Sequence, residues 1–257
     1  FRSLGLVRGD HIAILLENHP LFIQICVAAQ RAGLYYTAIS YRLQSEEVAY
    51  IVNDCGAKVF ITSKDRQMVV EALLPDLPEL DQAFMLDGLI AGFESLEDAM
   101  AAQPGTPISD ESIGTSMLYS SGTTGRPKGV FRQLPEGEWG AEDSAALFKA
   151  LYGATDDSIY LSPAPLYHAA PLTFSMGFLL GGMTLVIMEQ FDAEAALATI
   201  QRYKITHSQW VPTMFIRMLK LDEEARLRYD VSSRQCAIHA AAPCPVRVKE
   251  QMIEWWG

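Results

Sequence analysis

Short apolar segments alternate with stretches of helical periodicity along most of this chain. Residues 11–16 are almost entirely apolar, whereas residues 21–31 place apolar side chains at helical spacing and are followed by Gly33. Strands separated by helices are typical of βαβ units, in which helices connect parallel strands. The pattern therefore predicts an α/β fold with largely parallel sheets flanked by helices on both faces.

The same pattern assigns the remaining elements. We expect strands at residues 11–16, 35–40, 58–62, 83–86, 117–119, 158–161, 183–188, 206–211 and 235–240. We expect helices at residues 21–31, 45–54, 65–74, 173–180, 193–203, 212–221 and 245–256, with Asp192 as the N-cap of the fifth.

The segment 101–110 is the best candidate for a linker. It contains Gln103, Pro104, Gly105 and Pro107, which are residue types that interrupt helices and strands. It divides the chain into a first α/β unit at residues 1–103 and a second at residues 110–257.

Charge and composition argue against several classes of function. The chain has 20 lysines and arginines against 31 aspartates and glutamates, a formal net charge of −11, which disfavours general binding to nucleic acids or anionic membranes. Its apolar segments are far shorter than the roughly 20 residues of a membrane-spanning helix. The four cysteines form no CxxC pair, which indicates buried thiols in a reducing compartment. We therefore expect a cytoplasmic protein with no integral membrane segment.

Residues 114–130 carry the most informative chemistry, with the sequence Gly-Thr-Ser-Met-Leu-Tyr-Ser-Ser-Gly-Thr-Thr-Gly-Arg-Pro-Lys-Gly-Val. Glycines allow backbone N–H groups to converge on an anion, hydroxyl groups add donors, and Lys128 supplies a mobile cation. Most runs of this composition are surface loops, but the order of residues here favours a phosphate-binding loop. The Walker A pattern is absent, because Gly129 follows Lys128.

Residues 119–129 closely resemble the phosphate loop of the adenylate-forming superfamily, which contains acyl-CoA synthetases, luciferases and the adenylation domains of peptide synthetases. Residues 31–36, 165–168, 211–213 and 240–243 are similar to further motifs of that superfamily. The resemblance extends over nearly the whole chain. It implies the layered αβαβα fold of the superfamily's N-terminal domain, in truncated form, because the later motifs and the C-terminal domain do not follow.

The resemblance also implies site residues, and no metal ligand is among them. Catalytic roles would fall to Lys128, Thr123 and His168. The nucleotide would be bound by Ser120, Ser121, Gly122, Thr123, Thr124, Gly125, Lys128 and Ala241. The acid would be enclosed by Tyr167, His168, Trp210 and Ala242, although a tryptophan such as Trp210 is more often a core residue. The other histidines are expected to be packing residues, namely His11, His19, His207 and His239.

The implied reaction is attack of a substrate carboxylate on the α-phosphorus of ATP, with Mg²⁺, followed by transfer of the acyl group to the thiol of coenzyme A. A carboxylate is already a competent nucleophile, so the protein must neutralise phosphate charge and align the reactants. Amino-acid-activating members of the superfamily place an aspartate just after the position of His168, where this chain has Ala169 and Ala170. We therefore expect an apolar acid without an α-amine, such as a fatty or aromatic acid.

Several alternatives stay open. A kinase would transfer the γ-phosphate and release ADP, a non-catalytic module would only bind acyl groups or nucleotides, and an adenylating enzyme could pass the acyl group to another acceptor. A homodimer is compatible with the sequence. Since the later motifs are absent, we expect the 257 residues alone to be catalytically weak or inactive.

Overall fold

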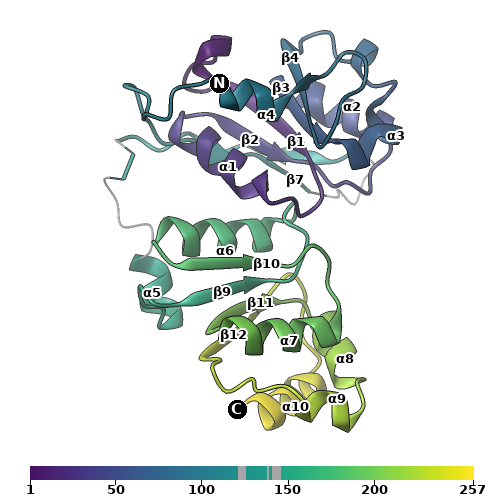
Figure 1. Cartoon of the computed structure of the whole chain (residues 1–257), viewed down its shortest axis with the longest axis vertical. Helices are drawn as coiled ribbons and strands as arrows, with labels where there is room; N and C mark the ends of the chain where they lie inside the picture. The colour runs from purple at the N-terminus through teal and green to yellow at the C-terminus, as the bar shows by residue number, and fades with distance from the viewer. Residues whose placement is uncertain (121–125, 138, 141–145) are drawn as a thin grey trace. The chain divides into compact units, whose positions relative to one another are not determined.

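The computed structural model describes residues 1–120, 126–137, 139–140 and 146–257. The chain divides into two compact units, residues 1–141 and residues 142–257. Each unit contains a parallel sheet with helices packed against it (Figure 1). This arrangement confirms the α/β fold that the alternation of apolar and amphipathic segments predicts.

The first unit contains a six-stranded parallel sheet in the order β5-β4-β3-β1-β2-β6. Its strands are β1 (His11–Leu15), β2 (Tyr35–Ala38), β3 (Ala57–Ser63), β4 (Gln82–Leu86), β5 (Glu94–Ser95) and β6 (Thr115–Ser116). Its helices are α1 (Leu21–Arg31), α2 (Ser45–Asp54), α3 (Gln67–Val70) and α4 (Leu96–Ala101), with 3-10 turns at Arg2–Leu4, Lys64–Arg66 and Leu74–Asp76. A separate antiparallel pair follows, formed by β7 (Leu118–Ser120) and β8 (Lys128–Val130).

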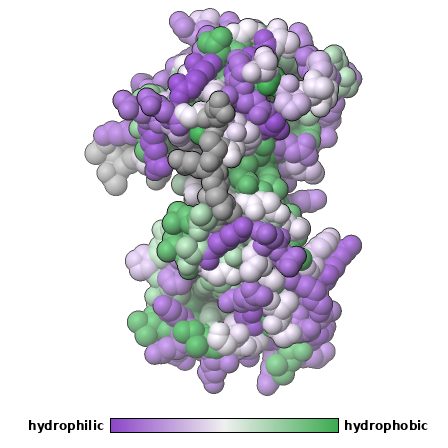
Figure 2. All heavy atoms as spheres, turned by 90° about the vertical axis from the view of Figure 1, so that its left-hand side faces the viewer, coloured by the Kyte–Doolittle hydropathy of each residue, from purple (hydrophilic) through white to green (hydrophobic). Residues whose placement is uncertain are grey.

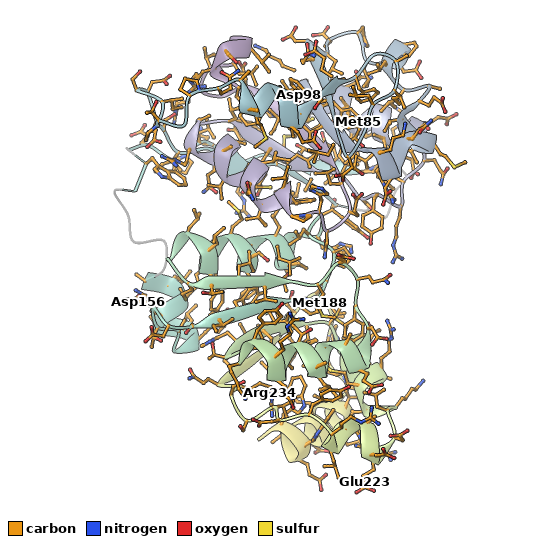
Figure 3. All side chains as sticks on the ribbon, viewed as in Figure 1. Met85, Asp98, Asp156, Met188, Glu223 and Arg234 are labelled. Carbon is orange, nitrogen blue, oxygen red and sulfur yellow. The ribbon has the colours of Figure 1, made fainter. Side chains whose placement is uncertain are left out.

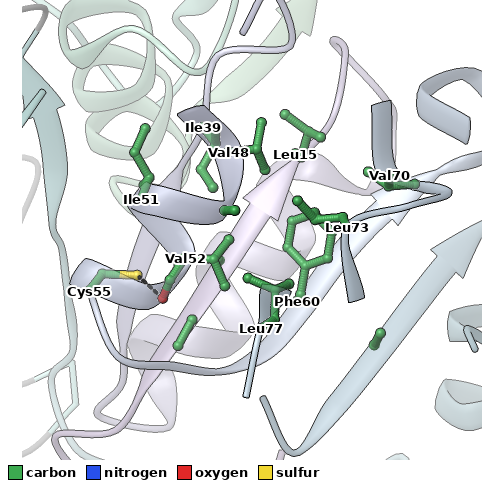
Figure 4. Close-up of a cluster of buried hydrophobic side chains, with 14 of the residues drawn as sticks. Leu15, Ile39, Val48, Ile51, Val52, Cys55, Phe60, Val70, Leu73 and Leu77 are labelled. Atoms are coloured by element: carbon green, nitrogen blue, oxygen red, sulfur yellow. Dashed lines mark hydrogen bonds between the residues drawn. The ribbon is translucent and has the colours of Figure 1, made fainter. Parts of the chain in front are cut away.

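Apolar side chains are buried on both faces of this first sheet. Alternate residues of a strand point to opposite faces, and both Ile14 and Leu15 of β1 are fully buried. Leu15 belongs to the core cluster under α2 that Figure 4 shows, together with Val48, Val52 and Phe60. Burial on both faces explains why residues 11–16 are continuously apolar instead of alternating with polar residues.

The second unit contains a four-stranded parallel sheet in the order β10-β9-β11-β12. Its strands are β9 (Ile159–Ser162), β10 (Thr184–Ile187), β11 (His207–Trp210) and β12 (Cys236–His239). Its helices are α5 (Ala146–Tyr152), α6 (Ala169–Leu180), α7 (Ala193–Tyr203), α8 (Pro212–Leu219), α9 (Glu223–Leu227) and α10 (Val246–Trp256).

Two clusters of buried side chains cover the faces of this second sheet. On one face, Tyr160 of β9 stacks on Phe178 of α6 with ring centroids 4.4 Å apart. On the other face, Leu161 of β9 packs in a cluster with residues of α7, α8 and α10. Met188, labelled in Figure 3, follows β10 and donates its backbone N–H to the Ser162 carbonyl at the end of β9.

Helix boundaries follow the expected capping signals at several sites. The α1 and α2 helices end at the residues that the sequence predicts, and the Asp192 side chain accepts a hydrogen bond from the Ala195 N–H, as an N-cap should. The expected helix at 65–74 is different: only Gln67–Val70 is α-helical. Pro75 has no backbone N–H to continue the α-helical hydrogen bonds, so the chain forms a 3-10 turn at Leu74–Asp76 instead, and Leu73 before it is fully buried.

The boundary between the compact units lies later in the chain than the expected linker at 101–110. The reason is tertiary pairing: β6 extends the first sheet by pairing in parallel with β2, so that Tyr35 lies opposite Thr115. Residues after the linker segment therefore complete the first unit instead of opening the second.

Hydrophilic side chains cover much of each unit on the face that Figure 2 shows, with smaller hydrophobic patches between them. Among the residues that the structure describes, no helix has the length and apolar character needed to cross a membrane.

Candidate active site

The hairpin of β7 and β8 carries the predicted phosphate loop. Tyr119 lies opposite Gly129, and Ser120 lies opposite Lys128. The Ser120 hydroxyl donates to the Lys128 carbonyl over 3.4 Å, and the Lys128 side chain is exposed. The hairpin thus brings two predicted phosphate ligands together at its neck. The remaining predicted ligands of the loop lie outside the described residues, namely Ser121, Gly122, Thr123, Thr124 and Gly125.

Glycine suits position 129, because the side chains of Met117 and Tyr119 pack closely against its backbone. A Cβ atom there would stand 2.5 Å from Met117 Cε and 3.0 Å from Tyr119 Cζ. Desolvation, together with the hydrogen bond that its hydroxyl donates to Asp54, raises the pKa of Tyr119 above its usual value. Tyr119 is therefore a neutral hydrogen-bond donor at physiological pH.

The second sheet provides a different kind of site at the carboxyl ends of its strands. Strand β10 lies on one side of β9, and β11 lies on the other, so the strand order reverses between β9 and β11. Ligands of open parallel sheets bind outside the carboxyl ends of the strands at such a reversal. The loops after β9, β11 and β12 meet at this edge, since Ser208 pairs with Leu161 and Trp210 pairs with His239.

Tyr167 and His168 lie in the loop after β9. His168 is exposed and is the N-cap residue of α6, and its backbone N–H donates to the Pro165 carbonyl over 3.2 Å. The Tyr167 ring is half-buried and lies 4.2 Å from the His168 ring, centroid to centroid. The α6 N-terminus has no acidic residue in its first turn and no side-chain cap hydrogen bond. Its positive dipole end favours a negative charge beside His168.

Ala241 lies in the loop after β12 and has an unusual backbone conformation. Its φ of 70° lies in the left-handed region, which residues other than glycine rarely adopt. The loop is attached to the neighbouring strand by the Ala240 N–H, which donates to the Trp210 carbonyl over 3.0 Å. Ala241 and Ala242 are both exposed. A strained residue at the carboxyl edge of a sheet is typical of a functional loop.

Comparison with known proteins identifies the family. The profile of the AMP-binding enzymes matches residues 1–257. The chain belongs to the family of AMP-binding enzymes. This confirms the relationship that the phosphate-loop motif and the four further motifs indicate.

The chain is similar to several acid–CoA ligases. It is 29% identical to a long-chain-fatty-acid–CoA ligase of Mycobacterium tuberculosis over 243 residues, which cover 95% of this chain and 47% of that ligase. It is 30% identical to the 2-succinylbenzoate–CoA ligase of Oceanobacillus iheyensis over 252 residues, or 97% of this chain and 48% of the relative. The chain therefore spans about half the length of these curated relatives.

The fold is similar to that of the N-terminal domain of FACL13 from M. tuberculosis, in a crystal structure with a bound inhibitor. The TM-score is 0.84 at 25% sequence identity, with 98% of this chain and 62% of that chain covered. The observed α/β architecture is thus that of an N-terminal domain of an adenylate-forming enzyme.

Trp210 lies within the core of the second unit. Its side chain is fully buried, and its indole N–H donates to the Ser208 hydroxyl over 2.7 Å. The rings of Phe215 and Trp256 lie 6.1 Å and 5.6 Å from it, centroid to centroid. These contacts are those of a packing residue. The resemblance assigns the Trp210 ring to the acid pocket, but in this structure the ring packs against Phe215 and Trp256.

Three of the other histidines also have packing or surface contacts. His207 is fully buried, and its Nε2 atom lies 3.0 Å from the Tyr152 carbonyl oxygen. His11 stacks on Tyr35, and His19 pairs with Asp87 over 3.0 Å. Among the described residues, no group of three or more His, Cys, Asp or Glu side chains is placed to hold a metal ion.

The structure adds contacts at the hairpin neck that the sequence does not indicate. Tyr50 and Asp54, both on α2, contact Pro127 and Tyr119. No sequence signal points to these contacts, because partners 77 and 65 residues apart are brought together only by the packing of the unit.

Proposed function

We propose that this protein activates a carboxylic acid with ATP as its acyl adenylate and then transfers the acyl group to the thiol of coenzyme A. The observation that carries the proposal is the match of the whole chain to the AMP-binding enzymes. The relatives support a thioester product, because two of them are named as CoA ligases of long-chain fatty acids and of 2-succinylbenzoate.

In the first step, a carboxylate oxygen attacks the α-phosphorus. A new O–P bond forms while the bond from that phosphorus to the bridging oxygen of the β-phosphate breaks, and pyrophosphate leaves with the electron pair. Lys128 and Ser120 would stabilise the charge of the departing phosphates as a cation and a hydroxyl donor. The exposed side chain of Lys128 at the hairpin neck is suited to that role.

In the second step, the thiol loses its proton and its sulfur attacks the carbonyl carbon. A C–S bond forms, and the bond from the carbonyl carbon to the AMP oxygen breaks, so AMP leaves. The mixed anhydride is reactive enough that the protein needs no covalent nucleophile of its own. Its task is to align the reactants.

We assign the acid to the carboxyl edge of the second sheet, beside His168 and Tyr167 and near Ala241 and Ala242. The positive end of the α6 dipole supports a carboxylate at this edge. The absence of an acidic residue in the first turn of α6 supports an acid without an α-amine, because a buried ammonium group needs a paired charge. Apolar acids are therefore the proposed substrate class.

Magnesium would enter with ATP. The described residues offer no cluster of ligands for the ion, and phosphate oxygens are among its preferred ligands. We therefore treat Mg²⁺ as part of the nucleotide substrate and assign no step to a protein-bound metal.

The test is acid-dependent exchange of labelled pyrophosphate into ATP by the full-length protein, measured over a panel of fatty, aromatic and amino acids. We expect exchange with apolar acids and little with amino acids, and thioester formation only when coenzyme A is added. Release of ADP would instead indicate a kinase. Exchange with amino acids alone would overturn the proposed substrate class.

A further inference from the structure

The neck of the phosphate-loop hairpin is attached to α2 at two points. The Tyr119 hydroxyl donates to Asp54 Oδ2, and the Tyr50 hydroxyl donates to the Pro127 carbonyl over 3.2 Å. Tyr50 and Asp54 are four residues apart and therefore lie on one face of α2. The first contact holds β7, and the second holds the chain just before β8.

Further contacts join the two attachment points. The Tyr50 hydroxyl lies 3.4 Å from Asp54 Oδ1, so the two α2 side chains also contact each other. The Arg126 guanidinium lies over the Tyr50 ring, 5.1 Å from its centroid. We call Tyr50, Asp54 and Tyr119 the neck triad.

The helix behind the neck triad is firmly placed. Val48, Ile51 and Val52 of α2 are almost completely buried in the core of the first unit. The N-terminus of α2 is closed by a capping box between Gln44 and Glu47, which stabilises the first turn. The helix can therefore serve as a fixed support.

The hairpin itself needs such a support. Strands β7 and β8 share three register pairs and form a two-stranded sheet apart from the six-stranded one. An isolated two-stranded hairpin is marginally stable in water. The Tyr119 ring packs closely against β8, since a Cβ atom at Gly129 would stand 3.0 Å from Tyr119 Cζ.

Each attachment is one residue from a predicted phosphate ligand, because Ser120 follows Tyr119 and Lys128 follows Pro127. We propose that Tyr50 and Asp54 are positioning residues that act through Tyr119 and Pro127 to hold Ser120 and Lys128 in place for the triphosphate of ATP. This inference rests on the proposed function, and it adds residues of α2 to the nucleotide site.

The test compares Tyr119→Phe and Asp54→Ala with the wild-type full-length protein. The Kd for ATP is measured by calorimetry without acid, and the KM values for ATP and for the acid are measured by pyrophosphate exchange. We expect the Kd and KM for ATP to rise about threefold to tenfold. Each variant loses the hydrogen bond between Tyr119 and the Asp54 carboxylate, and solvent weakens such a bond because the pair is partly exposed. The KM for the acid stays unchanged.

Two controls separate positioning from general destabilisation. Tyr203→Phe removes a tyrosine hydroxyl far along the chain in α7 and is expected to change neither constant. The double variant Tyr119→Phe/Asp54→Ala should bind ATP no more weakly than the worse single variant, because both changes remove the same hydrogen bond. Tyr50→Phe tests the second attachment and should weaken ATP binding on its own.

The outcomes are distinguishable. Equal increases in the KM values for ATP and acid, unchanged ATP binding in all three single variants, or fully additive losses in the double variant would overturn the positioning role. The proposed function would be overturned if the wild-type protein bound ATP but no acid of the panel supported pyrophosphate exchange. The Kd values for ATP would then still decide the role of the neck triad. A wild-type protein that does not bind ATP overturns both.

Discussion

Ser120 and Lys128 lie opposite each other at the neck of the β7–β8 hairpin, and the Ser120 hydroxyl donates to the Lys128 carbonyl over 3.4 Å. The pairing uses only the backbone of Lys128, so its ammonium group remains available to an anion. Two residues that are eight positions apart thereby become neighbours. Antiparallel pairing of β7 and β8 thereby places a lysine opposite Ser120 at the neck of the hairpin.

Lys128→Ala is predicted to weaken ATP binding about tenfold, because a charge-assisted contact to phosphate is lost. The fold should be unaffected, since the side chain is exposed. Calorimetry with ATP measures the first effect, and the thermal midpoint measures the second. Lys249→Ala, an exposed lysine of α10, is the matched control. Undiminished ATP binding by Lys128→Ala would contradict its assignment to the nucleotide.

Ala241→Gly is predicted to retain or slightly raise the free energy of unfolding. Glycine relieves the strain of a φ of 70°, which costs an L-residue roughly 1–2 kcal/mol, but it also increases the entropy of the unfolded chain. Ala241→Val should destabilise the protein, because a β-branched residue fits this conformation poorly. Denaturant unfolding of both variants measures the difference. A valine variant as stable as the glycine variant would show that the loop is not strained.

Trp210→Ala is predicted to lower the free energy of unfolding of the second unit by about 3–5 kcal/mol, as expected for a large aromatic side chain removed from a core. Trp255→Ala should cost less, because its ring is only half-buried. Urea unfolding followed by circular dichroism measures both values. If Trp210→Ala were as stable as wild type and only the KM for the acid rose, Trp210 would be a pocket residue instead of a core residue.

The stability of the second unit is predicted to fall as the pH is lowered through about 6.5. Burial lowers the pKa of His207, although its contact with the Tyr152 carbonyl opposes the shift. The unfolded chain therefore binds a proton at a higher pH than the folded chain does, so the stabilisation is present above the unfolded pKa and is lost as the pH falls below it.

His207→Gln should reduce this pH dependence, and His239→Gln, in the neighbouring strand, serves as the matched variant. The measurement is the free energy of unfolding between pH 5 and pH 8. An identical slope in His207→Gln and wild type would show that another group is responsible. The first unit has a partly buried histidine of its own, His11, and burial lowers its pKa as well.

Local patterns predicted much of the fold. The α1 and α2 helices and the Asp192 cap are encoded within a few residues, by apolar spacing and by glycine or a capping side chain. The α5 helix was not predicted, and residues 65–74 do not form one continuous helix. In the second case a proline and the burial of Leu73 prevail over the helical pattern.

The amino-acid sequence by itself determined the alternation of strands and helices, the order of residues in the phosphate loop and, through that order, the family. These are local properties, since strand burial, helix periodicity and glycine conformations depend on neighbours in the chain. Only the tertiary structure decided that β6 completes the first sheet, that Trp210 is enclosed in the second core, and that Asp54 contacts Tyr119. Each depends on residues far apart in sequence, and such contacts form only when the sheets and helices pack together.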